Sequence, residues 1–98
     1  MDCCEHKMKH TPRSEEDIKA LKSRINRIIG QLNGIAKMIE ENRYCGDVLT
    51  QIAATEKALE AVGLNVLSAH MNGCVKDDIL NGKFETIDET VELIRKLK

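Results

Sequence analysis

Residues 18–39 read IKALKSRINRIIGQLNGIAKMI, and this stretch decides the fold class. Its apolar residues recur at alternating steps of three and four; they are Ile18, Leu21, Ile25, Ile28, Leu32, Ile35 and Ile39. This spacing forms one apolar seam along a helix. A seam of this length favours packing against another long helix. The stretch therefore predicts an all-α protein built from paired helices.

The ends of this helix and two further helices can be predicted on either side of the seam. Ser14 is a typical N-cap residue and three acidic residues follow it, so the first helix is predicted to begin there. After a break at 41–44, a second helix is expected from about 45 to about 80, where Asn81-Gly82 indicates a turn. A third, shorter helix is expected from about 85 to 97. Together these predict a three-helix protomer.

Length and composition indicate one small domain that needs partner subunits. The chain has 98 residues, two aromatic residues and no tryptophan. A domain of this size buries only about 60–65% of its unfolded surface and is often marginal alone. We expect an N-terminal arm at 1–13, a single helical domain at 14–98, and an obligate homo-oligomer.

Several classes of protein are disfavoured by composition. No run of about 18 apolar residues could span a membrane, and the first residues lack the apolar core of a signal peptide. We therefore expect a cytoplasmic protein with no membrane partner, in which four cysteines serve as ligands or redox-active thiols. Nothing indicates an enzyme or a small-molecule substrate, because no acid or oxyanion donor accompanies the Cys and His residues.

Charge is distributed unevenly although the net charge is −1. Between residues 18 and 38 the charged side chains are all basic: Lys19, Lys22, Arg24, Arg27 and Lys37. The following stretch to residue 75 is mainly acidic. This asymmetry permits a surface that faces nucleic acid without requiring one.

A metal site is suggested by His70, Cys74 and Cys45. His70 and Cys74 are four residues apart, so on a helix they share a face, and both are ligands for Cu(I) or Zn(II). Plain packing explains this pair equally well, with Cys74 as a buried thiol and Cys45 as a small residue at a helix start. Cys45 lies 25 residues from His70, or about 37 Å along a straight helix. The three could meet only if an antiparallel partner helix supplied one of them, which predicts a site shared between two subunits.

Three motifs of this chain together resemble the copper-sensing repressor (CsoR) branch of the CsoR/RcnR/FrmR family of bacterial regulators. The motifs are RIIGQLNGI at 27–35, YCGDVLTQI at 44–52, and His70 with Cys74, and the similarity runs from about 18 to 75. The resemblance implies that two protomers form an antiparallel four-helix bundle and that two such dimers form a tetramer. It also implies that the metal-free tetramer binds operator DNA and that Cu(I) releases it, derepressing copper-resistance genes.

The resemblance also implies roles for individual residues. Cu(I) would be bound by Cys45 of one protomer and by His70 and Cys74 of the other, with Tyr44 and Glu89 around these ligands. Having all three ligands favours copper over the nickel, formaldehyde and persulfide branches. Phosphate contacts would come from basic and polar residues of the first two helices: Arg24, Arg27, Lys22, Lys19, Gln31, Lys37 and Lys57.

Some alternatives remain open from the sequence. The arm carries Cys3, Cys4, His6 and His10, which are either chance residues of a disordered tail or an auxiliary site for Zn(II) or Ni(II). The same scaffold could sense nickel, zinc or a persulfide through Cys45 and Cys74. A copper chaperone or store is a further alternative, which the basic first helix disfavours.

Overall fold

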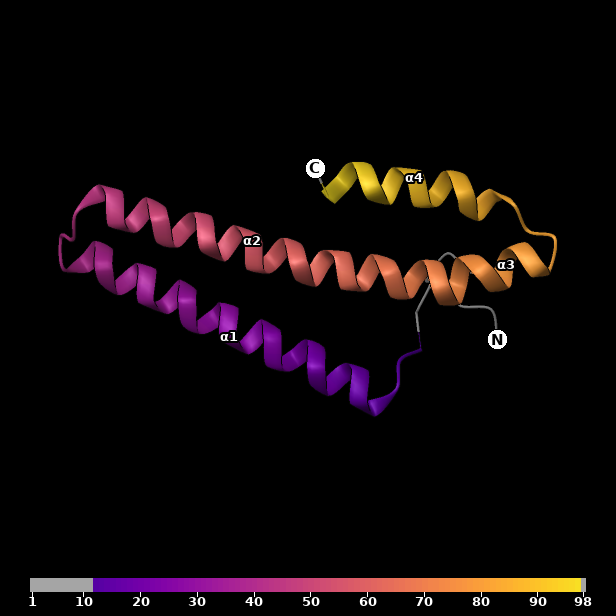
Figure 1. The fold of residues 1–98 in the computed structure, drawn as a ribbon, viewed down its shortest axis with the longest axis horizontal. Helices are drawn as coiled ribbons and strands as arrows, with labels where there is room; N and C mark the ends of the chain where they lie inside the picture. The colour runs from indigo at the N-terminus through magenta and orange to yellow at the C-terminus, as the bar shows by residue number, and fades with distance from the viewer. Residues whose placement is uncertain (1–11, 98) are drawn as a thin grey trace. The chain divides into compact units, whose positions relative to one another are not determined.

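The computed structural model describes residues 12–97 and is helical throughout that range, with no strand there (Figure 1). In chain order its elements are α1 (Glu15–Glu40), α2 (Cys45–His70), the π-helical segment η1 (Met71–Val75), α3 (Lys76–Leu80) and α4 (Glu85–Leu97). The prediction of an all-α chain is confirmed. The chain divides into two compact units, one at Ser14–Val62 and one that begins at Gly63. We call them the hairpin unit and the C-terminal unit.

The hairpin unit consists of α1 and the first part of α2, which run antiparallel (Figure 1). Ser14 caps α1 as predicted, because its hydroxyl oxygen accepts a hydrogen bond from the Asp17 N–H at 3.1 Å. The other end of α1 closes through Asn42, whose φ of 54° is in the left-handed region. This lets the Arg43 N–H donate to the Met38 carbonyl at 2.9 Å, which satisfies a carbonyl at the helix end.

The apolar seam of α1 separates into two rows in the structure. Ile28 and Ile35, seven residues apart, are buried within the chain, as are Thr55 and Val62 of α2. The alternate seam positions remain exposed in a single chain: Ile18, Ile25, Leu32 and Ile39. One row therefore packs inside the hairpin unit, and the other is left as an apolar row on its surface.

The C-terminal unit differs from the predicted single helix over 45–80. The regular α-helix stops at His70, and the Lys76 N–H then donates to the Met71 carbonyl five residues back, which is the π-helical pattern. Gly73 lies within this turn, where a low helix propensity makes the wider geometry less costly. The helix resumes as α3 and ends at Leu80. Gly82 follows with a φ of 77°, so the predicted turn is confirmed.

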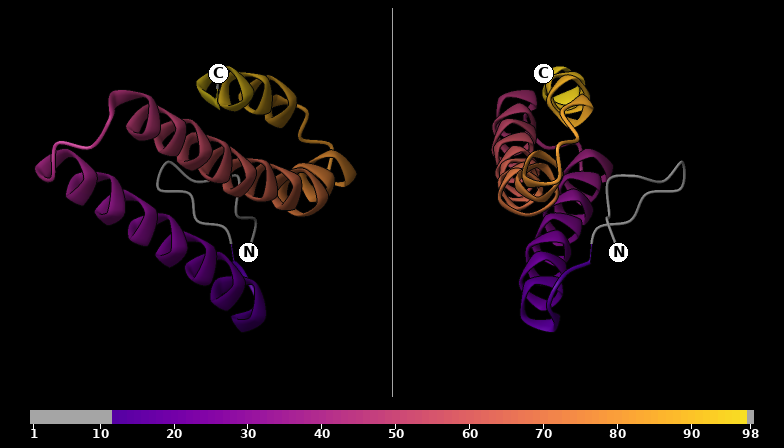
Figure 2. Two further views of the ribbon diagram at one scale, coloured as in Figure 1. Left: turned by 60° about the vertical axis from the view of Figure 1, so that its left-hand side comes forward. Right: turned by 90° about the vertical axis from the view of Figure 1, so that its right-hand side faces the viewer.

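Helix α4 then folds back along the last part of α2 (Figures 1 and 2). Gly63 allows a close approach there, because a Cβ atom on Gly63 would lie 2.9 Å from Leu97 Cδ2. The C-terminal unit buries Cys74 and Val75 of η1 and also Asp78, Thr86 and Thr90. The buried face of α4 is thus made by two threonines one turn apart.

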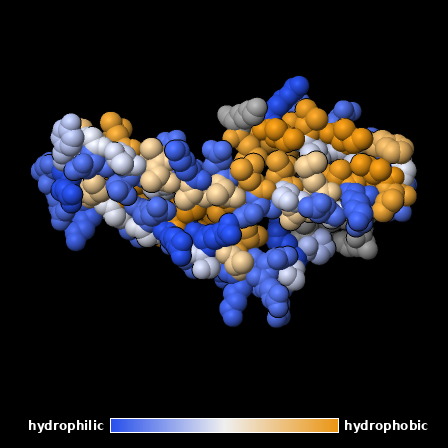
Figure 3. Space-filling view, in the orientation of Figure 1, coloured by the Kyte–Doolittle hydropathy of each residue, from blue (hydrophilic) through white to orange (hydrophobic). Residues whose placement is uncertain are grey.

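Much apolar surface stays exposed in the single chain. Figure 3 shows apolar side chains gathered over α4 and the end of α2 within the C-terminal unit. Exposed apolar residues of α4 are Ile87, Val91, Leu93 and Leu97. Within residues 12–97, no helix is long and apolar enough to cross a membrane. Large exposed apolar patches usually mark contact sites for other proteins.

Candidate metal centre and DNA-facing residues

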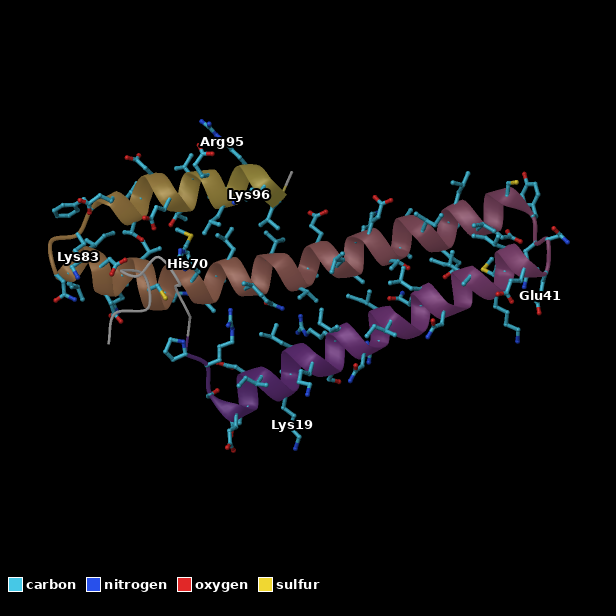
Figure 4. All side chains as sticks on the ribbon, turned by 180° about the vertical axis from the view of Figure 1, so that it is seen from behind. Lys19, Glu41, His70, Lys83, Arg95 and Lys96 are labelled. Carbon is cyan, nitrogen blue, oxygen red and sulfur yellow. The ribbon has the colours of Figure 1, made fainter. Side chains whose placement is uncertain are left out.

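His70 is the last residue of α2 and lies half-buried on the side that faces α4 (Figure 4). Its Nε2 atom is 3.4 Å from Thr90 Oγ1. Thr90 is 5% exposed, and its hydroxyl also donates to the Thr86 carbonyl at 2.7 Å. Helix α4 therefore contacts the imidazole directly through Thr90.

Cys74 lies in the π-helical turn that follows His70. Its side chain is 3% exposed, and the residue is disulfide-bonded in the structure. The sequence predicted cysteines that serve as ligands or redox-active thiols rather than structural disulfides, and this stays a prediction. Metals bind the thiolate form of cysteine, and Cys74 can therefore act as a ligand only after reduction. Because the turn is π-helical, the spacing of a regular α-helix does not describe how Cys74 stands relative to His70.

Cys45 opens α2 and carries a free, exposed thiol. Tyr44 precedes it and is 74% exposed. The Tyr44 ring lies against Gly46, where a Cβ atom would collide with it. The chain thus presents the predicted Tyr and Cys at one end of α2 and His70 at the other.

The side chain found against His70 was not among the predicted residues. We predicted Glu89 as a neighbour of the ligands, but Glu89 is exposed, and the contact to His70 Nε2 is made by Thr90. The predicted role of Glu89 remains untested. The helical period places Thr86 and Thr90 on the face of α4 opposite to its charged residues, but it does not indicate that Thr90 contacts His70.

Within residues 12–97, no three His, Cys, Asp or Glu side chains lie together as a cluster that could hold a metal ion. His70 and Cys74 are four residues apart in the sequence, at the end of α2 and within η1 respectively. The predicted auxiliary ligands of the arm lie outside the described residues: Cys3, Cys4, His6 and His10.

The predicted phosphate contacts lie mostly on α1. The basic side chains are all exposed: Lys19, Lys22, Arg24, Arg27 and Lys37 on α1, and Lys57 on α2. Figure 4 shows Lys19 extending away from its helix. Gln31 differs, because it is half-buried and its Oε1 atom is buried without a hydrogen-bond partner among residues 12–97. The structure therefore leaves the basic residues accessible and turns the Gln31 oxygen inward.

Comparison with known proteins decides which family this arrangement belongs to. Residues 17–96 match the family of metal-sensitive transcriptional repressors. The chain belongs to this family. Its relatives in the family include the copper-sensing transcriptional repressor CsoR of Bacillus subtilis, which is 39% identical over 94 residues, covering 94% of this chain and 91% of that protein.

A second relative is similar over a shorter stretch. The copper-sensing transcriptional repressor RicR of Mycobacterium tuberculosis is 51% identical over 59 residues, which are 60% of this chain and 62% of RicR. The match therefore spans less than two thirds of the length of RicR. The relatives compared are named as transcriptional repressors or regulators rather than enzymes.

Two solved structures of the family share the fold. The crystal structure of the copper-sensing repressor CsoR with Cu(I) from Geobacillus thermodenitrificans NG80-2 has a TM-score of 0.84 and 41% identity, covering 89% of this chain and 92% of that chain. The nickel-responsive transcriptional regulator InrS has a TM-score of 0.73 and 33% identity, covering 91% and 98%. The predicted family and its helical fold are confirmed.

Proposed function

We propose that this protein is a Cu(I)-responsive transcriptional repressor of the cytoplasm. The metal-free protein binds operator DNA, and Cu(I) binding lowers its affinity for that DNA and derepresses copper-resistance genes. The observation that carries this proposal is the complete Cys45, His70 and Cys74 set in a metal-sensitive repressor whose structural relative binds Cu(I). In this role the protein is a regulator and not an enzyme.

The donors suit Cu(I). Two thiolates and one imidazole are soft ligands, and a three-coordinate set suits Cu(I) while leaving Zn(II) short of its usual fourth ligand. When bound, the Cu(I) ion would offset one of the two thiolate charges.

The site is shared between two protomers in this proposal. Cys45 is the first residue of α2 and His70 is its last, so they stand at opposite ends of a 26-residue helix. An antiparallel α2 from a second copy brings the start of one helix beside the end of the other. Each dimer would then hold two equivalent sites, as twofold symmetry requires.

The exposed apolar row of α1 supports this assembly. Ile18, Ile25, Leu32 and Ile39 repeat every seven residues and stay uncovered in one chain. A second hairpin unit placed against this row would bury it, which forms the antiparallel four-helix bundle that we propose. The apolar surface of α4 is then available for joining two dimers into a tetramer.

DNA binding is proposed for the basic face of α1. Arg27 opens the motif at 27–35 and Arg24 lies three residues before it. Both are exposed, and we propose that both contact phosphates. The other proposed contacts are Lys19, Lys22, Lys37 and Lys57, with Gln31 as a polar neighbour. Phosphate contacts give salt-dependent affinity with little sequence choice. A tetramer repeats the patch four times, so a protomer charge of −1 is no obstacle.

Metal and DNA are coupled through helix packing in this proposal. Ligation ties the start of α2 in one protomer to the end of α2 in the other, and Tyr44 and Glu89 are proposed to pass the change to neighbouring helices. The coupling free energy between the metal site and the DNA site is the same whichever ligand binds first. DNA binding should therefore weaken Cu(I) affinity by the same factor.

A nickel response is the second candidate, because the nickel-responsive regulator InrS shares the fold. Anaerobic titration of Cu(I), Zn(II) and Ni(II) against operator-bound, reduced protein decides between the two. We expect Cu(I) alone to release the DNA, measured by fluorescence anisotropy of the labelled operator. Release by Ni(II) instead would favour the second candidate, and release by neither metal would reject both.

Cys45→Ala provides the matched test of the site. The variant should bind operator as well as the wild type and fail to respond to Cu(I), because it loses one of three ligands. Thr50→Ala is the control, since Thr50 is exposed in the same part of α2 and is not a proposed ligand. A Cys45→Ala protein that still released DNA with Cu(I) would contradict the proposed site.

A further inference from the structure

In the contact between Thr90 of α4 and His70, the other hydrogen bond of Thr90 decides which residue donates and which accepts. Thr90 Oγ1 has two neighbours: the Thr86 carbonyl at 2.7 Å and His70 Nε2 at 3.4 Å. A threonine hydroxyl has one proton to donate and two lone pairs that can accept. A carbonyl oxygen can only accept, so the short contact to Thr86 uses the hydroxyl proton.

The longer contact must then run the other way. With its proton directed at Thr86, Thr90 Oγ1 can only accept a hydrogen bond from His70. This requires a proton on Nε2, and a neutral imidazole carries one proton shared between its two nitrogens as alternative tautomers. Nδ1 is then the nitrogen that keeps its lone pair.

We propose that Thr90 is the positioning residue of the metal site, because it holds His70 in the Nε2–H tautomer and leaves Nδ1 as the nitrogen that binds the metal. This inference rests on the proposed metal site for its consequence, but the tautomer itself is a property of the metal-free protein. Metal-binding histidines commonly donate their second N–H to an acceptor that fixes the ring and its tautomer. Here the acceptor is a neutral hydroxyl rather than a carboxylate.

The rest of the C-terminal unit supports a specific role for this threonine. Thr90 and Thr86 lie one turn apart, and both are buried on the face of α4. Thr86 Oγ1 has no hydrogen-bond partner among residues 12–97, whereas Thr90 Oγ1 has two. Both threonines are buried on α4, but only the hydroxyl of Thr90 contacts His70, so substitutions of Thr90 and of Thr86 form a matched pair.

The first measurement is the tautomer of His70 in reduced, metal-free, full-length protein. Two-bond ¹H–¹⁵N correlation spectra at mildly alkaline pH distinguish the tautomers, and a His70→Gln sample identifies the His70 signals. We expect the Nε2–H form in the wild type and in Thr86→Val, and a mixture of tautomers in Thr90→Val. An Nδ1–H tautomer in the wild type would overturn the proposal.

The second measurement is Cu(I) affinity, by competition with a chromophoric Cu(I) chelator under anaerobic conditions. Removing a hydrogen-bond partner of a ligating histidine typically weakens metal binding about 10- to 100-fold. The contact between Thr90 and His70 is long and therefore weak, so we expect Thr90→Val to lower the Cu(I) affinity by about 10-fold. Thr90→Ser keeps the hydroxyl and should restore affinity, and Thr86→Val should leave it unchanged. Equal losses in the two valine variants would indicate packing and overturn the role of Thr90.

The two measurements separate this inference from the proposed function. If the wild type bound no Cu(I), the proposed metal site would fail, while the spectra of the metal-free protein would still show which tautomer Thr90 selects. If Cu(I) bound tightly and the spectra showed the wrong tautomer, the site would stand and the positioning role of Thr90 would fail.

Discussion

Replacing Leu32 by alanine tests whether the exposed row of α1 is covered by a second protomer. Leu32 is 52% exposed in the single chain, and Ile29, on the same helix but outside the seam, is 48% exposed. Full burial of such a side chain contributes about 1.5–3 kcal/mol. Contacts within one chain therefore predict a similar loss of about 1 kcal/mol per protomer for Leu32→Ala and Ile29→Ala.

Assembly changes this expectation for Leu32 alone. If a partner hairpin covers the row, Leu32→Ala leaves a cavity in a closed interface, where such substitutions cost about 2–5 kcal/mol. We expect Leu32→Ala to lower the free energy of unfolding by at least about 2 kcal/mol per protomer, and Ile29→Ala by about 1. The two variants should thus differ by about 1 kcal/mol or more.

Urea unfolding at two protein concentrations, together with sedimentation equilibrium, measures the effect. The unfolding midpoint of an obligate oligomer depends on protein concentration, so Leu32→Ala should show a lower midpoint and earlier dissociation on dilution. Ile29→Ala should dissociate as the wild type does. Equal unfolding costs with unchanged assembly would refute the idea that this row is the interface.

Three further predictions concern the ends, the surface and the ligands of the chain. Ser14→Ala removes the acceptor of the Asp17 N–H and should destabilise the protein by about 1 kcal/mol in thermal or urea unfolding, whereas Ser14→Asp should not. Arg27→Ala should weaken operator binding and make the slope of log affinity against log salt concentration about one unit shallower for each protomer that contacts DNA. An unchanged slope would show that Arg27 does not contact phosphate. Protein kept oxidised should bind less Cu(I) than protein reduced with a phosphine, because Cys74 is disulfide-bonded and must become a thiolate before it can bind the metal. Equal Cu(I) stoichiometry in the oxidised and reduced proteins would exclude Cys74 as a ligand.

Local chemistry along the chain was sufficient to predict the helices and their ends. The heptad seam predicted α1, Ser14 predicted its start, and Asn81-Gly82 predicted the turn before α4. These signals are short-range, because capping, glycine conformation and helical period depend on neighbouring residues. The family could likewise be recognised from the motifs, since they are continuous in sequence.

The π-helical turn and the partner of His70 required the tertiary structure. Nothing in the sequence from Met71 to Val75 distinguishes a π-helical turn from a regular one. Thr90 was not predicted as the neighbour of His70, because the contact joins residues 20 apart across a helical reversal. Glu89, one residue away, has more suitable chemistry for a ligand neighbour but lies on an exposed face.

The packing of the apolar seam of α1 is determined partly by the sequence and partly by the tertiary structure. The sequence by itself determined that every third or fourth residue of α1 is apolar and that the helix must pack, because the helical period is a property of the backbone. Only the tertiary structure decided that Ile28 and Ile35 pack within the hairpin unit while the row containing Leu32 stays exposed. The physical reason is that one neighbouring helix can cover only part of an apolar seam, and which part depends on how the two helices pack in space.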